Sequence, residues 1–335
     1  MRGYELDSHK NCQARLRRIS EEMWKKFRYQ LEHGGLLITA KLIPLLPRMF
    51  VLLIARVGGR IASVADRTGR RIALANLNAV FGKRYSASEK RGIVRKSYQH
   101  FGQTMLDLMW SSRLTSGNFH RYIDFEWPRQ LQPGENVIIA CYHYSNFEWL
   151  SLACGFQGLR GTILAQEFKN SVLEPIFRRL RQQSGHFFIP RTGGILRVFK
   201  VLRRGESTAM LIDLTVPPGS SAVAINCLGL QKSVTPAHAW LHQRTGVALI
   251  PAHCEPLEGG RYRIVFHPRV ELGPNATVAE VAQACWDTFE PVLRANPSPW
   301  LWMYKHWRYR PMRTDRSYPF YSSPHAKFEQ MLARK

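Results

Sequence analysis

The sequence is poor in acidic residues and in cysteine. It has 24 Asp and Glu against 48 Lys and Arg, a formal net charge of +24 that is spread from Arg2 to Lys335. This excess favours an anionic partner, such as nucleic acid, an anionic membrane or an acidic carrier protein. With 45% hydrophobic and 21% charged residues in 335 positions, the chain has a globular composition and enough length for one large α/β domain or two smaller ones.

Several familiar motifs are also missing. There is no P-loop, no G-x-G-x-x-G and no paired carboxylate motif, so we expect neither a metal nor a nucleotide cofactor. The six cysteines form no C-x-x-C pair, which disfavours a disulfide framework or a zinc site and fits a reducing compartment. Because the first 30 residues are polar and charged, we expect no cleavable signal peptide.

One apolar run is long enough to suggest a membrane helix. The segment "LLITAKLIPLLPRMFVLLI", residues 36–54, contains Lys41, Arg48, Pro44 and Pro47. A cation at the centre of a spanning helix costs about 3 kcal/mol. We therefore predict a kinked segment in the membrane interface, with its two cations reaching the lipid headgroups. A buried helical hairpin is the alternative.

The rest of the chain alternates between strand and helix patterns. Ser86 and Glu89 form a capping box for a helix that reaches about Trp110. Strands are expected at 136–142, 161–166, 186–190, 207–213, 248–256 and 262–272. Helices are expected at 21–33, 146–156, 171–185, 193–205, 237–246 and 277–295. This order predicts an α/β fold with a mainly parallel central sheet flanked by helices.

These patterns also suggest a division of the chain. We expect an N-terminal helical region at 1–116 with a membrane-associated segment at 36–58, an α/β domain at 117–320 and a C-terminal tail at 321–335.

A histidine and a glutamate lie at the junction of an apolar strand and an apolar helix. In "VIIACYHYSNFEWLSLA", residues 137–153, His143 and Glu148 are five positions apart, which is about 140° around a single helix. We instead expect His143 at the C-terminal end of the strand, Ser145 or Asn146 as the helix cap, and Glu148 in the first turn. Open α/β sheets bind their ligands at this edge. Glu148 would then orient the imidazole and leave its other nitrogen as a base; a helix cap or a structural hydrogen bond is the plainer alternative.

No protein nucleophile accompanies this pair. Ser145 is too close to His143 in sequence for a usual nucleophile–base pair, and there is no G-x-S-x-G elbow. A base without a nucleophile suggests direct attack of a substrate hydroxyl on an activated acyl group.

The stretch "HYSNFE" resembles the H-x-x-x-x-[DE] motif of glycerolipid acyltransferases. It is more closely similar to H-x-x-N-[WF]-E of the late acyltransferases of lipid A biosynthesis, the lauroyl and myristoyl transferases. The likeness runs through residues 36–320. Four further segments resemble the family in order: "ANLNAVFGKRYSASEKRGIVRKSYQHFG", "NSVLEPIFRRLRQQSG", "PRTGGILRVFKVLRRGESTAMLID" and "NPSPWLWMYKHWRYRP".

The resemblance implies a glycerolipid-acyltransferase-like fold and a set of site residues. His143 would be the general base and Glu148 its partner. Asn146 would shape the site, and Arg181 and Asp213 would lie around the substrate pocket. No cofactor is implied.

The sequence departs from the family pattern at several positions. Gln166 replaces an arginine, and Leu214 follows Asp213 where the family usually has Gln or His. In the closing motif, Ser298, Pro299 and Tyr304 replace Glu, Gln and His. These changes leave the base intact and the identity of the acceptor open.

The resemblance further implies an acyl carrier protein as the donor, a glycolipid acceptor (a lipid A precursor or a related lipid) and the cytoplasmic face of a bacterial inner membrane. An acidic carrier protein and an anionic membrane both suit the positive charge. Arg178 and Arg179 are candidates for the carrier surface, with Arg181 turned inward.

Other functions stay open. The tail "WLWMYKHWRYRP" fits an interfacial anchor, a nucleic-acid reader or an amphipathic segment packed on the core. The alternative functions are a hydrolase or thioesterase that uses the same pair, and a basic membrane- or nucleic-acid-binding protein with a decayed site; our prediction includes no nucleic-acid partner.

Overall fold

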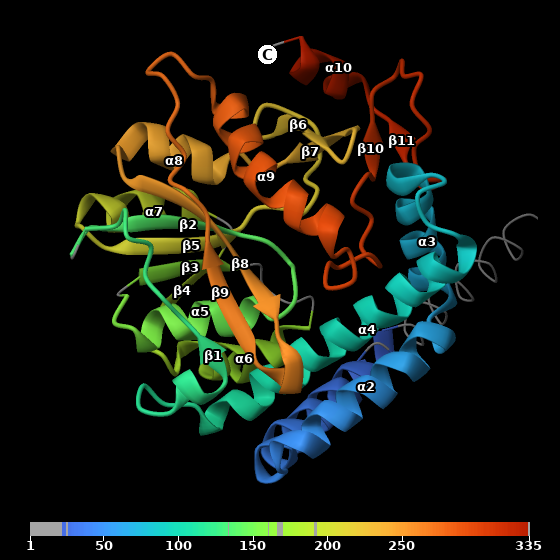
Figure 1. Cartoon of the computed structure of the whole chain (residues 1–335), viewed down its shortest axis with the longest axis vertical. Coiled ribbons are helices and arrows are strands. Elements are labelled where there is room, and N and C mark those ends of the chain that lie inside the picture. Colours follow the sequence, from blue (N-terminus) through green and yellow to red (C-terminus); the bar gives the residue numbers. More distant parts are fainter. Residues whose placement is uncertain are drawn as a thin grey trace, which may run out of the picture.

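A seven-stranded sheet forms the centre of the computed structural model, which describes residues 22–24, 26–132, 134–159, 161–165, 170–190 and 193–333. The strand order is β1-β9-β8-β2-β5-β3-β4 (Figure 1). Strands from β8 to β4 pair in parallel, whereas β9 is antiparallel to β8 and parallel to β1. The bounds are β1 Ile123–Asp124, β2 Val137–Cys141, β3 Gly161–Ala165, β4 Phe187–Pro190, β5 Ser207–Leu211, β8 Ala248–Pro256 and β9 Tyr262–Phe266. The predicted mainly parallel sheet is confirmed.

Helices cover both faces of the sheet. On β2, Ile138 and Ala140 belong to one apolar core, and Val137, Ile139 and Cys141 belong to the other. Burial on both sides explains why this strand is an unbroken apolar run. The helices of the second core include α5 (Phe147–Phe156) and α6 (Glu174–Gln182), and those of the first include α7 (Gly194–Arg203), α8 (Ala237–Thr245) and α9 (Val278–Ala295).

The sequence patterns missed an antiparallel hairpin, β6 (Val223–Cys227) and β7 (Leu230–Val234). Its two-residue turn is Leu228–Gly229, with φ of 55° and 87°. Such turns usually carry Asn-Gly or Asp-Gly, because a left-handed φ is strained for a leucine. The usual hairpin signal is therefore absent from the sequence.

The described part of the N-terminal region, from residue 22 onward, is mostly helical. Residues 26–42 are helical, a short 3₁₀ turn covers Ile43–Leu45, and α2 follows at Arg48–Ala65. The break falls at the two prolines, as expected. Next come α3 (Arg67–Phe81) and α4 (Ala87–Trp110), the latter starting at the predicted capping box. Among the described residues, no helix is long and apolar enough to cross a membrane.

Helix α2 has its large apolar side chains on the outside. Small residues, Ala55, Gly59 and Ser63, are buried together with Val51. The fit to α4 is so close that a Cβ on Gly59 would lie 2.5 Å from Cα of Gln99, and Figure 1 shows α2 running alongside α4. The outward side chains are Met49, Phe50, Leu53, Ile54, Val57, Ile61 and Val64. This distribution is the reverse of that in a helix that faces water.

The aromatic C-terminal segment belongs to the core. Trp300, Trp302 and Trp307 are fully buried. The anchor and nucleic-acid interpretations of these tryptophans are therefore wrong, and packing on the core is what the structure shows. The chain then forms the short pair β10 (Tyr309–Arg310) and β11 (Ser323–Pro324) and ends in α10 (Ala326–Leu332), whose buried Phe328 packs in a cluster with Ala224 of β6.

Candidate active site

His143 and Asp213 come together because β2 and β5 are parallel neighbours. Cys141 pairs with Leu211 in the register of the two strands. Each site residue stands two positions beyond its strand's last residue, so both lie at the carboxyl edge of the sheet, where such folds bind ligands. The predicted position of His143 at the end of its strand is confirmed.

Asp213 holds the imidazole through one carboxylate oxygen. Nδ1 of His143 is 2.7 Å from Oδ1, and the backbone N–H of His143 donates to Oδ2 at 3.1 Å. The indole N–H of Trp300 also donates to Oδ2, at 2.8 Å. Among the described residues, Nε2 has no hydrogen-bond partner. An ionised Asp213 therefore fixes the tautomer with Nδ1–H and leaves the Nε2 lone pair free to accept a proton.

The charge of Asp213 is maintained although its carboxylate is fully buried. Burial alone would raise the pKa of Asp213, but the contact with His143 and the charge of the nearby Lys232 together hold that pKa below its usual value. A group whose pKa is lowered on folding stabilises the protein above its unfolded pKa and loses that contribution as the pH falls toward the folded value. The carboxylate thus stays ionised at neutral and mildly acidic pH.

Glu148 has a different partner from the expected one. Its carboxylate accepts two hydrogen bonds from Arg181, from Nε at 2.9 Å and from an Nη at 2.5 Å. The expectation that Glu148 orients His143 is therefore wrong in this geometry, because Asp213 occupies Nδ1. The expectation that Arg181 points inward is met, since its side chain is 19% exposed. The catalytic roles of His143 and Glu148 stay predictions.

An apolar pocket of about 400 Å³ opens beside the imidazole. That size is within the range of small-molecule sites. His143, Glu148 and Arg181 line it, whereas Asp213 and Asn146 do not. The apolar walls come from several elements: Phe101, Met105, Phe147, Leu150, Phe177 and Leu211 are among them. A space of this kind can hold a hydrocarbon chain with one end at the base.

The turn between β2 and α5 is held by side chains of α4. Asn146 is the N-cap of α5, and its Oδ1 accepts from the N–H of Trp149 at 3.0 Å. Its Nδ2 donates to Asp107 at 3.0 Å. Ser145 has a left-handed φ of 50° and a backbone oxygen that accepts from Thr104 at 2.9 Å. Asn146 therefore shapes the site as a cap, not as a pocket wall.

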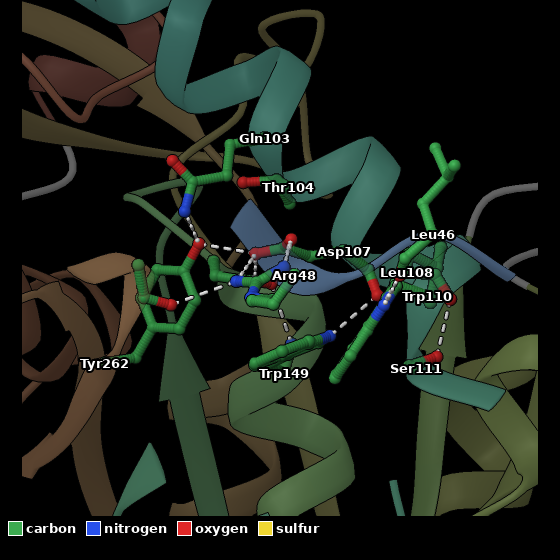
Figure 2. A network of polar contacts seen from close by, with 12 residues as sticks. Leu46, Arg48, Gln103, Thr104, Asp107, Leu108, Trp110, Ser111, Trp149 and Tyr262 are labelled. Atoms are coloured by element: carbon green, nitrogen blue, oxygen red, sulfur yellow. Dashed lines mark hydrogen bonds and ion pairs between the residues drawn. The ribbon is translucent and has the colours of Figure 1, made fainter. Parts of the chain in front are cut away.

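Arg48 is part of the same network, in contrast to our expectation. Figure 2 shows its guanidinium at Asp107, close to Tyr262 and Trp149. It forms a bidentate pair with Asp107 and donates to the backbone oxygen of Gly260 at 2.9 Å. The predicted contact of Arg48 with lipid headgroups is thus wrong, because a buried carboxylate requires a partner inside the protein.

The sequence patterns did not indicate that two further residues of the site are buried. Lys232 and His306 lie behind Asp213 and are fully buried. A lysine in a short strand usually faces water, and the sequence patterns did not predict this strand.

Gln166, the expected departure from the family, lies outside the described residues. Among the described residues, no group of three or more His, Cys, Asp or Glu could hold a metal ion.

The parallel sheet, the imidazole–carboxylate pair at its carboxyl edge and the adjoining apolar pocket together form the candidate active site. The family model of the bacterial lipid A biosynthesis acyltransferases matches residues 25–309, and the chain belongs to this family. No curated protein sequence matches the chain. The family assignment makes the protein a transferase of acyl groups in lipid A biosynthesis.

Proposed function

We propose that the protein transfers a fatty acyl chain from an acyl carrier protein thioester to a hydroxyl group of a glycolipid, a lipid A precursor or a related lipid. The observation that carries this proposal is the imidazole of His143, held by Asp213, at an apolar pocket of about 400 Å³. In this proposal the pocket binds the acyl chain, and the imidazole contacts the acceptor hydroxyl.

The reaction needs one proton to move twice. Nε2 of His143 accepts the proton of the hydroxyl as its oxygen attacks the thioester carbonyl, and the C–O bond forms. The tetrahedral intermediate collapses, the C–S bond breaks, and the imidazolium returns the proton to the leaving thiolate. Asp213 stabilises the transient imidazolium. The N-terminal end of α5 and the guanidinium of Arg181 are the positive groups available at the pocket for the developing oxyanion.

Glu148 acts in this proposal by holding Arg181. Two hydrogen bonds fix the guanidinium plane on the pocket wall, and a bidentate pair gives a well-defined direction to the charge. Glu148 thus shapes the pocket wall, whereas Asp213 contacts the imidazole.

The donor is proposed to be an acyl carrier protein, because such proteins are acidic and Arg178 and Arg179 are exposed on α6. Electrostatic attraction of this kind speeds encounter and weakens as salt rises. We expect faster transfer from the carrier protein than from coenzyme A with the same acyl chain, and a steeper loss with salt. Initial rates with both donors at low and moderate salt check this.

Matched variants sharpen the donor test. Arg178→Glu with Arg179→Glu should slow transfer from the carrier protein. Arg91→Glu with Arg95→Glu, the same change of charge at exposed positions of α4, should have a smaller effect. Equal or faster transfer from coenzyme A without the steeper salt loss refutes the donor assignment. Acyl release at the same rate without any acceptor identifies a hydrolase instead.

We further propose that the N-terminal region, residues 1–116 with its segment 36–58, holds the enzyme at the cytoplasmic face of the inner membrane. The outward apolar face of α2 supports this: Met49 is 70% and Ile61 is 62% exposed. An apolar face of this size favours a membrane surface or another apolar partner. The α/β domain, 117–320, and the tail, 321–335, would then stand on the cytoplasmic side.

Polar substitutions on α2 should release the protein from membranes. Met49→Ser, Leu53→Ser and Ile61→Ser together should lower the fraction bound to anionic vesicles at least about tenfold, because each buried apolar side chain contributes about 1.5–3 kcal/mol. The measurement is vesicle flotation. Deleting residues 1–58 is a poorer test, because it also removes Arg48 from Asp107.

The control is an equal number of exposed apolar residues elsewhere: Phe187→Ser, Leu196→Ser and Leu272→Ser, at positions 66%, 66% and 46% exposed. This triple variant should float like the wild type. If the α2 variant floats as fully as the control, the apolar face of α2 is not the membrane contact.

A further inference from the structure

A lysine is fully buried behind the His143–Asp213 pair. Lys232 lies on β7, and its Nζ donates to the backbone oxygen of Asp213 at 2.5 Å and to Nδ1 of His306 at 3.1 Å. The other ring nitrogen of His306 is 2.9 Å from the backbone oxygen of Leu301. Since Nε2–H donates there, Nδ1 carries a lone pair and accepts from the lysine.

Three indole rings surround the ammonium group. Nζ is 5.2 Å from the ring centre of Trp300, 5.8 Å from that of Trp286 and 5.9 Å from that of Trp307. A cation near the faces of several aromatic rings is stabilised, most of all where water is excluded. The cage thus offsets part of the large cost of burying a charge.

Lys232 is linked to the reacting imidazole through one residue. The backbone oxygen of Asp213 accepts a hydrogen bond from the ammonium of Lys232, and its carboxylate accepts one from the imidazole of His143. Trp300 contacts both the carboxylate and the ammonium: its indole N–H donates to Oδ2 of Asp213, and its ring lies beside Nζ of Lys232. The lysine, the cage and the carboxylate therefore form one buried unit behind the base.

We propose that Lys232 is a positioning residue that keeps Asp213 ionised and in place behind His143, an inference that rests on the acyl transfer proposed above. A carboxylate can stabilise the imidazolium only while it is charged. Full burial of the carboxylate disfavours its charged form. A fixed cation bound to the backbone oxygen of Asp213 favours the charged form without competing for Nδ1 of His143.

The other titratable groups around Asp213 do not supply this charge. Burial raises the pKa of Cys141, Tyr142 and Cys227, so all three stay neutral. Burial lowers the pKa of His306, which also stays neutral beside the lysine. Burial lowers the pKa of Lys232 as well, but the negative charge of Asp213 acts in the opposite direction. Lys232 is thus the cation that contacts Asp213 at its backbone oxygen, whereas His143 contacts its carboxylate.

The test is the pH dependence of kcat/KM for Lys232→Met and Lys232→Gln in the full chain. The charge of Lys232 lowers the pKa of Asp213, so its loss makes the pair take up a proton at higher pH. We expect the acid-side midpoint of both variants to rise by about one pH unit or more. Gln can still donate to the backbone oxygen of Asp213, so a shift in both variants assigns the effect to the charge.

Lys90 provides the matched control. It is also buried, on α4, with its Nζ bonded to the backbone oxygen of Gly82 and, at 2.8 Å, to Asn78. Lys90→Met should lower the melting temperature without moving the acid-side midpoint.

The outcomes separate this inference from the proposed function. Active Lys232 variants with the wild-type midpoint overturn the role of the lysine and leave acyl transfer standing. Transfer that is indifferent to His143 overturns the function itself. If the Lys232 variants do not fold, ¹⁵N-lysine NMR of the wild type can show whether the side chain of Lys232 is charged. A slowly exchanging ammonium that is still protonated at pH 8 supports the inference, and a neutral amine there overturns it.

Discussion

His143→Ala should reduce acyl transfer by about 10³-fold or more, because a positioned general base contributes about 10²–10⁴-fold and this imidazole also returns the proton to the leaving group. The substitution removes the imidazole, which lines the pocket, and leaves the other lining residues unchanged. The measurement is the initial rate with a saturating acyl carrier protein thioester and the glycolipid acceptor. KM for the donor should change little, since the acyl chain binds apolar side chains.

The control must separate the loss of the base from any loss of stability caused by the unpaired carboxylate of Asp213. In His143→Ala, Asp213 loses the partner of its Oδ1, and an unpaired buried charge can cost about 3–5 kcal/mol of stability. His143→Asn keeps an amide N–H near the place of Nδ1 and has no basic nitrogen. We expect it to melt closer to the wild type and to be as inactive as the alanine variant. Full activity in either folded variant contradicts the proposed mechanism.

The order of strands and helices was predictable because it depends on local patterns. The apolar run of β2, the cap at Asn146 and the capping box at Ser86 are each encoded within a few residues. The hairpin of β6 and β7 was not predictable in this way, since its turn begins at Leu228 in place of the usual Asn or Gly.

The site was predictable in part. Local sequence placed His143 at the strand end and Glu148 in the first helical turn, where both are found. It favoured Glu148 as the partner because that carboxylate is near in sequence. Asp213 is 70 positions away, and only the parallel register of β2 and β5 brings it to the imidazole.

The same limit applies to Arg48. If an apolar run lies in a membrane, a cationic side chain within it is expected to extend toward the lipid headgroups. The tertiary structure instead supplies Asp107 from α4 and the carbonyl of Gly260, which follows β8. Partners this far apart in the chain cannot be found from spacing.

The roles of the two carboxylates lead to the second large effect. Asp213→Asn should lower kcat by about 10³–10⁴-fold, because the amide that replaces the carboxylate can donate to Nδ1 and stabilise the tautomer with Nε2–H, which cannot accept a proton. The volume of the side chain is kept, and the pocket is unchanged since Asp213 does not line it. KM should therefore stay near the wild-type value, and steady-state kinetics give both numbers.

Glu148→Gln should act differently. Its carboxylate meets Arg181 on the pocket wall and not the imidazole. Loss of a charged hydrogen bond, about 1.5–3 kcal/mol, corresponds to a fall in kcat/KM of about 10- to 100-fold, part of it through KM. If Glu148 and Arg181 act as a unit, Glu148→Gln combined with Arg181→Gln should be little worse than either change alone.

The comparison decides which carboxylate serves the base. If Glu148→Gln matches the kcat loss of Asp213→Asn, leaves KM unchanged and adds fully to Arg181→Gln, then Glu148 acts on His143 directly. The ion pair with Arg181 would then have to open during the reaction. A larger kcat effect at Asp213 and a non-additive pair at Glu148 and Arg181 instead fit the resting geometry. In that case Asp213 orients the imidazole and Glu148 holds the positive wall of the pocket.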